Sequence, residues 1–186
     1  YGLLAASLVL SRPEGKGGRL LQRWLLTALM AGTLVMLVSA HVRLSLYEEA
    51  YGYSVLRFLV HAFLVYMAAL LVAAFWRIWR EGVSLVRLFA LISLAAWLAI
   101  NCADVDRRVA ELNIARHEQG GELDAGYLTR LSDDAVPALL EISGQFPEVR
   151  EDLDRRLRAM NGEERSFATF NLSRHRARKL LENEFR

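Results

Sequence analysis

Two runs of 19 residues without a formally charged side chain, residues 24–42 and 58–76, constrain the fold of this chain most strongly. An α-helix rises about 1.5 Å per residue, so each run is long enough to cross about 30 Å of hydrocarbon. Inside a bilayer, backbone polar groups must be hydrogen-bonded within their own segment. Both runs are therefore predicted to be transmembrane helices.

A third apolar run covers residues 88–103, and it extends to residues 83–103 if Arg87 reaches back to the interface. We predict a third span over residues 83–103. Residues 1–10 are also apolar, and the chain does not begin with methionine. We interpret this short stretch as the last turns of another span that begins outside this sequence.

Charge divides the chain near residue 103. Residues 1–103 contain 9 basic and 4 acidic residues, whereas residues 104–186 contain 14 basic and 17 acidic ones. The first part is too apolar for a soluble domain, and the second is too charged for a membrane. The predicted fold class is all-α, with polytopic membrane helices over residues 1–103 and a small extramembrane helical domain over residues 104–186. A disulfide-stapled fold is excluded because Cys102 is the only cysteine.

Basic residues predict the orientation. Segments 11–23 and 77–87 together carry seven arginine and lysine residues, against two in the connection between residues 42 and 58. The positive-inside rule places the two basic segments in the cytoplasm. The C-terminal domain is then expected on the periplasmic or extracellular side of a bacterial inner (plasma) membrane.

Glycine and proline residues recur along the tail at positions typical of helix ends and starts, and they predict several short helices. The expected helices cover residues 104–117, 123–131, 135–142, 147–160 and 163–185. We interpret Ser132, Asp133 and Asp134 as N-cap residues, with Pro137 in the first turn that follows. A domain of about 80 residues buries only a modest core, so we expect it to lean on the membrane part or on a partner.

Three blocks resemble a known group of proteins: LYEEAYG at residues 46–52, LDAGYLTRLSDDAVPAL at residues 123–139, and FNLSRHRAR at residues 170–178. Together they are similar to the C-terminal region of multi-pass bacterial inner-membrane proteins known only as a domain of unknown function. The resemblance covers roughly residues 20–180. It implies several spans followed by a charged helical tail, and it assigns no activity and no catalytic residue.

A polar cluster near the outer ends of the spans is the first candidate site. Its members are His41, Glu48, Glu49, Arg57, His61 and Asp104. Ionisable groups at this depth are costly unless they are paired. We interpret the cluster mainly as a structural clamp in which Arg57 pairs with Glu48 or Glu49, and alternatively as a proton or ligand path. No HxH or HExxH spacing supports a metal site.

A basic cluster in the last helix is the second candidate, formed by Arg174, Arg176, Arg178 and Lys179. Such a cluster suits an anionic lipid surface or an acidic partner. The simpler interpretation is an exposed face neutralised by the acidic residues of the same domain. With 14 basic against 17 acidic residues, the tail is not predicted to bind nucleic acid.

The sequence shows no nucleophile and base pair and no motif for a metal or cofactor, so we predict no catalytic, cofactor or metal site and no enzyme activity. The leading prediction is a structural or accessory subunit of a membrane protein assembly. It would dock through its helical C-terminal domain and have membrane lipids and other subunits as partners. The alternative is a transporter or proton-coupled sensor that uses the polar cluster.

Overall fold

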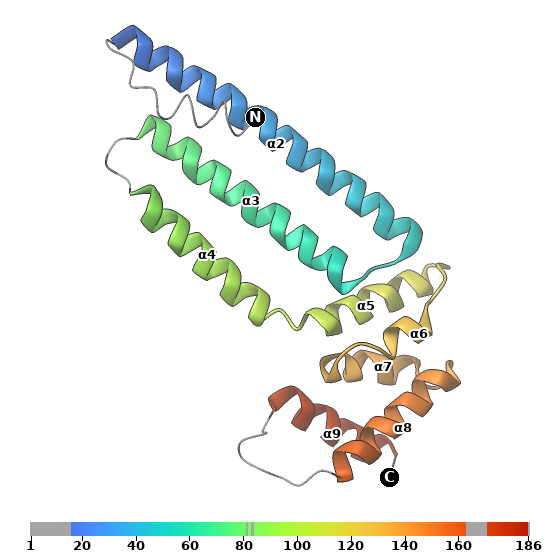
Figure 1. Ribbon diagram of the computed structural model, residues 1–186. Helices are drawn as coiled ribbons and strands as arrows, with labels where there is room; N and C mark the ends of the chain where they lie inside the picture. Colours follow the sequence, from blue (N-terminus) through green and yellow to red (C-terminus); the bar gives the residue numbers. More distant parts are fainter. Residues whose placement is uncertain (1–15, 81, 83, 163–170, 186) are drawn as a thin grey trace. The chain divides into compact units, whose positions relative to one another are not determined.

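The computed structural model describes residues 16–80, 82, 84–162 and 171–185, and the span remnant expected at residues 1–10 lies outside them. The described part is helical and contains no strand, which confirms the all-α prediction (Figure 1). It forms two compact units. The span unit holds the described residues before Glu48 together with Leu59–Ala99, and the tail unit holds Glu48–Phe58 together with the described residues from Ile100 onward.

Three long apolar helices form the span unit: α2 (Lys16–Tyr51), α3 (Val55–Trp79) and α4 (Leu85–Asn101). Their ends at the connection and at the tail belong to the tail unit, namely the last four residues of α2, the first four of α3 and the last two of α4. The first two helices are long and apolar enough to cross a membrane, and α4, a largely apolar helix of 17 residues, is part of a possible third span. Their bounds contain the predicted spans at residues 24–42 and 58–76. The chain is therefore an integral membrane protein.

Few polar contacts join the three helices of the span unit. The Trp79 indole donates to the Thr27 hydroxyl over 3.3 Å, and the Tyr66 and Ser93 hydroxyls lie 2.8 Å apart. These bonds place α3 beside both α2 and α4 in antiparallel order, as Figure 1 shows. Among the described residues of this unit, only Ala73 is buried.

Beyond the end of α4, the described part of the tail unit contains six short helical elements. They are α5 (Val105–Glu118), α6 (Ala125–Leu128), the 3-10 turn η1 (Asp133–Ala135), α7 (Val136–Ile142), α8 (Pro147–Gly162) and α9 (Leu172–Glu184). Gly120 follows α5 with φ at 93°, a conformation that suits the predicted glycine stop. Pro147 opens α8 as expected, while the predicted start of the last helix at residue 163 lies outside the described residues.

One hydrophobic core lies inside the tail unit. Its largest fully buried side chains are Leu128, Leu139, Leu153, Leu181, Val109, Val136 and Val149. Tyr53, Val55 and Phe58, from the connection between α2 and α3, pack against this core. The connection between α2 and α3 therefore belongs to the fold of the tail unit.

The predicted capping role of Ser132, Asp133 and Asp134 is wrong. Ser132 precedes η1, but its side chain makes no capping hydrogen bond to the backbone. Asp133 instead forms ion pairs with Arg156 at 3.4 Å and Arg174 at 3.8 Å. A carboxylate close to two guanidinium groups gains more from them than from a backbone N–H of a one-turn helix. Pro137 lies in the first turn of α7, as predicted.

Candidate functional site

Side chains of α5 and α6 hold the connection between α2 and α3, and we call this arrangement the connection clamp. Its residues are Asn113, Arg116 and Tyr127. Arg116 donates from Nε to the carbonyl of Glu49 over 3.0 Å and from Nη2 to the carbonyl of Ala50 over 3.0 Å. The last carbonyls of a helix have no partner within the helix, so a guanidinium is well suited to the end of α2.

Asn113 pairs with the backbone of Tyr53 in both directions. Its Oδ1 accepts from the Tyr53 N–H over 2.9 Å, and its Nδ2 donates to the Tyr53 carbonyl over 2.9 Å. The Tyr127 hydroxyl accepts from the N–H of Val55 over 2.9 Å. Val55 begins α3, where the first N–H groups lack a helical acceptor. Each contact therefore satisfies a backbone group that the hairpin leaves open.

Gly52 is required at the turn of the hairpin for two reasons. Its φ is 81°, in the left-handed region that side chains disfavour. A Cβ added here would also lie 2.9 Å from Oδ1 of Asn113. The close approach between the connection and α5 thus depends on the absence of a side chain.

The residues of the predicted polar cluster fall into both units. Glu48, Glu49, Arg57 and Asp104 belong to the tail unit, whereas His41 and His61 belong to the span unit. Glu48 is buried in the last turn of α2, and Arg57 donates from Nη1 to the carbonyl of Gly52 over 2.5 Å. Arg57 thus binds the backbone of the connection, while its predicted pairing with Glu48 or Glu49 stays a prediction.

The two histidines of the span unit are in contact. Nδ1 of His41 lies 2.8 Å from Nδ1 of His61, and the rings meet edge to face with centroids 4.5 Å apart. An N···N hydrogen bond needs a hydrogen on one nitrogen and a lone pair on the other. This contact therefore requires one proton, shared between the two Nδ1 atoms.

Asp104 lies between α4 and α5 with φ at 43°, the only positive value at a non-glycine residue in the described chain. Its carbonyl accepts from the Arg108 N–H over 3.1 Å, which starts α5. The Glu111 carboxylate, 2.7 Å from Arg107, raises the pKa of that guanidinium, and Asp104 adds to the effect. Asp104 thus marks a backbone bend and contributes negative charge to the first turn of α5.

The basic cluster of α9 is divided between internal and exposed residues. Arg178 donates to the Met160 carbonyl over 3.3 Å and to Oδ1 of Asn161 over 2.8 Å, so it joins α9 to the end of α8. Arg174 pairs with Asp133. Arg176 and Lys179 are exposed. Two of the four predicted contact residues therefore stabilise the tail itself.

Arg156 connects three elements of the tail unit through its guanidinium. It contacts Asp152 at 2.7 Å and Asp133 at 3.4 Å, and it donates to the carbonyls of Thr129 and Leu131 over 2.7 and 2.8 Å. The side chains of Arg156 and Asp152 are both largely buried. A buried charge held by this many partners is a structural feature, and it fixes α8 against the segment that follows α6.

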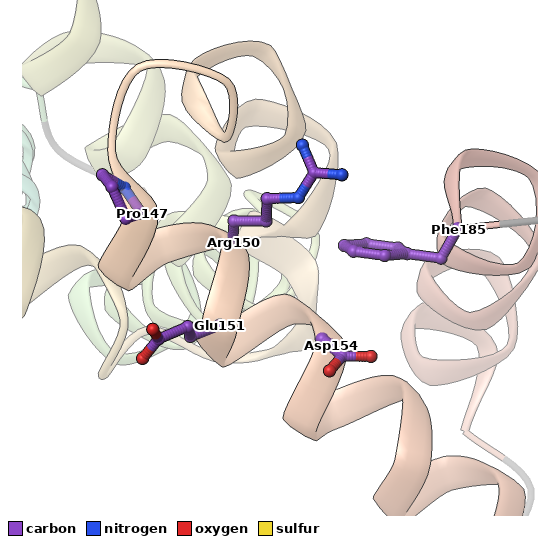
Figure 2. Close-up of a pocket in the computed structure, with 5 residues that line it drawn as sticks. All are labelled: Pro147, Arg150, Glu151, Asp154 and Phe185. Carbon is purple, nitrogen blue, oxygen red and sulfur yellow. The ribbon is translucent and has the colours of Figure 1, made fainter.

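A surface groove of about 430 Å³ lies between α8 and the end of α9. Figure 2 shows Phe185 pointing from the end of α9 towards Arg150 and Asp154 on α8. The Arg150 guanidinium carbon lies 5.7 Å from the centre of the Phe185 ring, in cation–π contact. Glu151 and Pro147 complete the groove.

Sequence reasoning did not find Asn113, Arg116 or Tyr127 as functional residues. Asn113 carried a usable signal, because asparagine is a poor former of helix interiors yet lies in the middle of α5. Arg116 and Tyr127 carried none, because they bind backbone groups more than 60 residues away. Among the residues that the structure describes, no group of three or more side chains is placed to hold a metal ion.

Comparison with protein families matches residues 1–142 to one described as a domain of unknown function, DUF4153. Neither the curated proteins nor the solved structures contain a match to this chain. The match confirms the resemblance to an uncharacterised family over residues 1–142 and adds no activity to it. The chain belongs to the DUF4153 family, and it is an integral membrane protein of unknown activity.

Proposed function

We propose that this chain is a structural or accessory subunit of a membrane protein assembly. One observation carries the proposal. None of the residues in the most apolar stretch of α2, and only 6% of those in α3, are buried within the chain. Helices in a membrane gain stability from close packing against other helices. Spans with this much free apolar surface are suited to pack against further transmembrane helices.

The tail supports the proposal through its exposed basic residues. Arg176 and Lys179 are exposed on α9, and Leu180 beside them is 40% exposed. We call these three residues the α9 surface. Arg174 and Arg178 are held by Asp133 and Asn161 respectively, so Arg176 and Lys179 are the members of the basic cluster that are exposed to another molecule. The charge of the α9 surface suits a neighbouring subunit that presents acidic side chains.

The proposed location is a bacterial inner membrane, with the tail on the periplasmic or extracellular side. The support is the excess of basic residues in segments 11–23 and 77–87. A cysteine-reactive, membrane-impermeant label tests it. In a Cys102→Ser background, which removes the exposed native cysteine, the label added to intact cells should react with a cysteine placed at Glu118, which is exposed on α5. It should miss a cysteine placed at Arg80, which is exposed just after the last residue of α3.

Photo-crosslinking in native membranes tests the assembly. A photoreactive amino acid at residue 176 or 179 should give one discrete protein adduct, because the α9 surface would face the neighbour. The matched control is residue 118, which is exposed on another helix of the same tail. Adducts of lipid mass only at residues 176 and 179, or the same adduct at residue 118, would contradict docking through the α9 surface.

A second candidate function, a transporter or proton-coupled sensor, is favoured by the His41–His61 pair. Protonation of both Nδ1 atoms removes the lone pair that their 2.8 Å contact needs. Histidine is the side chain that most often changes charge between about pH 5 and pH 8. A single proton shared between α2 and α3 is the kind of group that a proton-coupled mechanism uses.

The two candidates give different results for His61→Gln. Glutamine keeps a hydrogen-bonding group but cannot take up a proton near neutral pH. If the pair is structural, the variant should retain normal assembly and show no change in pH response. If the pair carries a proton signal, the distance between spin labels at residues 40 and 62, measured in a Cys102→Ser background, should depend on pH with His61 present and lose that dependence with glutamine.

A further inference from the structure

A pocket of about 630 Å³ lies in the span unit, at the end where α2 begins and α3 ends. Three arginines line it: Arg19 and Arg23 on α2 and Arg77 in the last turn of α3. Its remaining lining is largely apolar and includes Leu26, Met30 and Leu85. The pocket thus combines cationic groups from two helices with an apolar surface that continues into the span.

Charge at this end of the helices is strongly biased. Segments 11–23 and 77–87 contain seven basic residues and two acidic ones, Glu14 and Glu81, which lie outside the described residues. The aromatic rings of Trp24 and Trp79 meet here edge to face at 5.5 Å. Tryptophan prefers the headgroup level of a bilayer. The arginines of the pocket therefore lie at the depth where lipid phosphates are found.

We propose that this pocket is a binding site for an anionic phospholipid. Arg19, Arg23 and Arg77 bind the phosphate headgroup, and the upper acyl chain lies against Leu26 and Met30. Guanidinium groups match phosphate oxygens with paired hydrogen bonds. Basic pockets between transmembrane helices are a recurring place for such headgroups. A soluble phosphate would use only the arginines, whereas the apolar lining fits a lipid.

Quenching of tryptophan fluorescence by brominated lipids tests the site in the full chain. The four tryptophans of the sequence are reduced to Trp24 and Trp79 by Trp76→Phe and Trp97→Phe. The protein is placed in nanodiscs of phosphatidylcholine that contain increasing fractions of brominated phosphatidylglycerol. Quenching should reach half of its maximum at a lower fraction than with brominated phosphatidylcholine.

Substitution of the three pocket arginines tests whether they cause the preference for the anionic lipid. Each Arg→Gln change in the pocket should raise the half-maximal fraction about fivefold, and the triple variant should lose all preference for the anionic lipid. The matched control is Arg80→Gln with Arg87→Gln, because both arginines are exposed at the same end of the helices and neither lines the pocket. This control should change the half-maximal fraction less than twofold. The triple Arg→Lys variant should keep most of the preference, which separates loss of charge from misfolding.

Three results would overturn the proposal. The triple Arg→Gln variant could bind like the wild type, which would mean that the arginines do not contact lipid. The control could lose as much preference as the triple variant, which would indicate general surface charge. Glycerol phosphate in solution could abolish the quenching, which would identify a site for a free phosphate.

Discussion

The two units of this protein differ in whether their apolar side chains are buried within the chain. The tail unit is the more charged, yet the fully buried large side chains of the described chain lie in it. The span unit is the more apolar, yet it buries only Ala73 among its described residues. Side chains such as Val35, Met36 and Leu91 are more than 60% exposed. Apolar content alone therefore does not indicate an internal core.

The difference follows from the solvent that each unit meets. In water, a leucine gains free energy by leaving the solvent, so the tail must fold around its own leucines. In a bilayer, the lipid is as apolar as the side chain, so burial within the protein gives little further gain. Each span satisfies its backbone as a helix by itself, so any further stability must come from close packing against neighbouring helices. The connection clamp is part of the tail unit, and it satisfies backbone groups at the end of α2 and at the start of α3, where the helices cannot do so themselves.

Replacement of Arg156 by methionine should have the largest effect on the tail. It would leave Asp133 and the largely buried Asp152 without this partner, and we expect the free energy of unfolding to fall by about 3–5 kcal/mol. Arg158→Met is the control, since Arg158 pairs with Asp154 but its side chain is 80% exposed. That exposed pair should contribute about 0–1 kcal/mol. Urea titration of the full chain in micelles, followed by hydrogen exchange in α8, measures both. Equal losses would mean that the tail does not enclose this charge.

Leucine truncations compare the two units directly. Leu139→Ala removes a fully buried side chain of the tail and should cost about 2–5 kcal/mol. Leu91→Ala in α4 removes a side chain that is 64% exposed and should change stability by about 0.5 kcal/mol or less. Hydrogen exchange of α7 and of α4, measured in the same micelles, reports each change. A large loss for Leu91→Ala would show that α4 packs against another helix at this position.

In both units, sequence patterns predicted the helices better than the contacts that their side chains make. Uncharged runs predicted the positions of α2 and α3, because the length and charge of a segment are local properties that decide whether it can cross a bilayer. Gly120 and Pro147 placed helix ends for the same local reason. Asp133 was misread as a cap, since its partners Arg156 and Arg174 lie 23 and 41 residues away. The connection clamp was missed because its side chains bind backbone groups, which look the same in every sequence.

Alanine at two glycines should separate the connection from the spans. Gly52→Ala places a side chain at a left-handed residue and against Asn113, and it should cost about 1–2 kcal/mol. Gly32→Ala in α2 meets no atom within 4 Å and should be neutral or raise helix stability by up to about 1 kcal/mol. Thermal unfolding monitored by circular dichroism gives both values. Destabilisation by Gly32→Ala would reveal a close neighbour at that face of α2.

The smallest effects are expected from two tyrosine hydroxyls. Tyr127→Phe removes the acceptor for the Val55 N–H and should cost about 1 kcal/mol. Tyr66→Phe breaks the bond to Ser93 between α3 and α4, and bonds between membrane helices average about 0.6 kcal/mol. Amide exchange at Val55 should accelerate about fivefold in Tyr127→Phe and stay unchanged in Tyr66→Phe. If both variants left Val55 protected, another group would satisfy the start of α3, and the connection would depend on Asn113 and Arg116 alone.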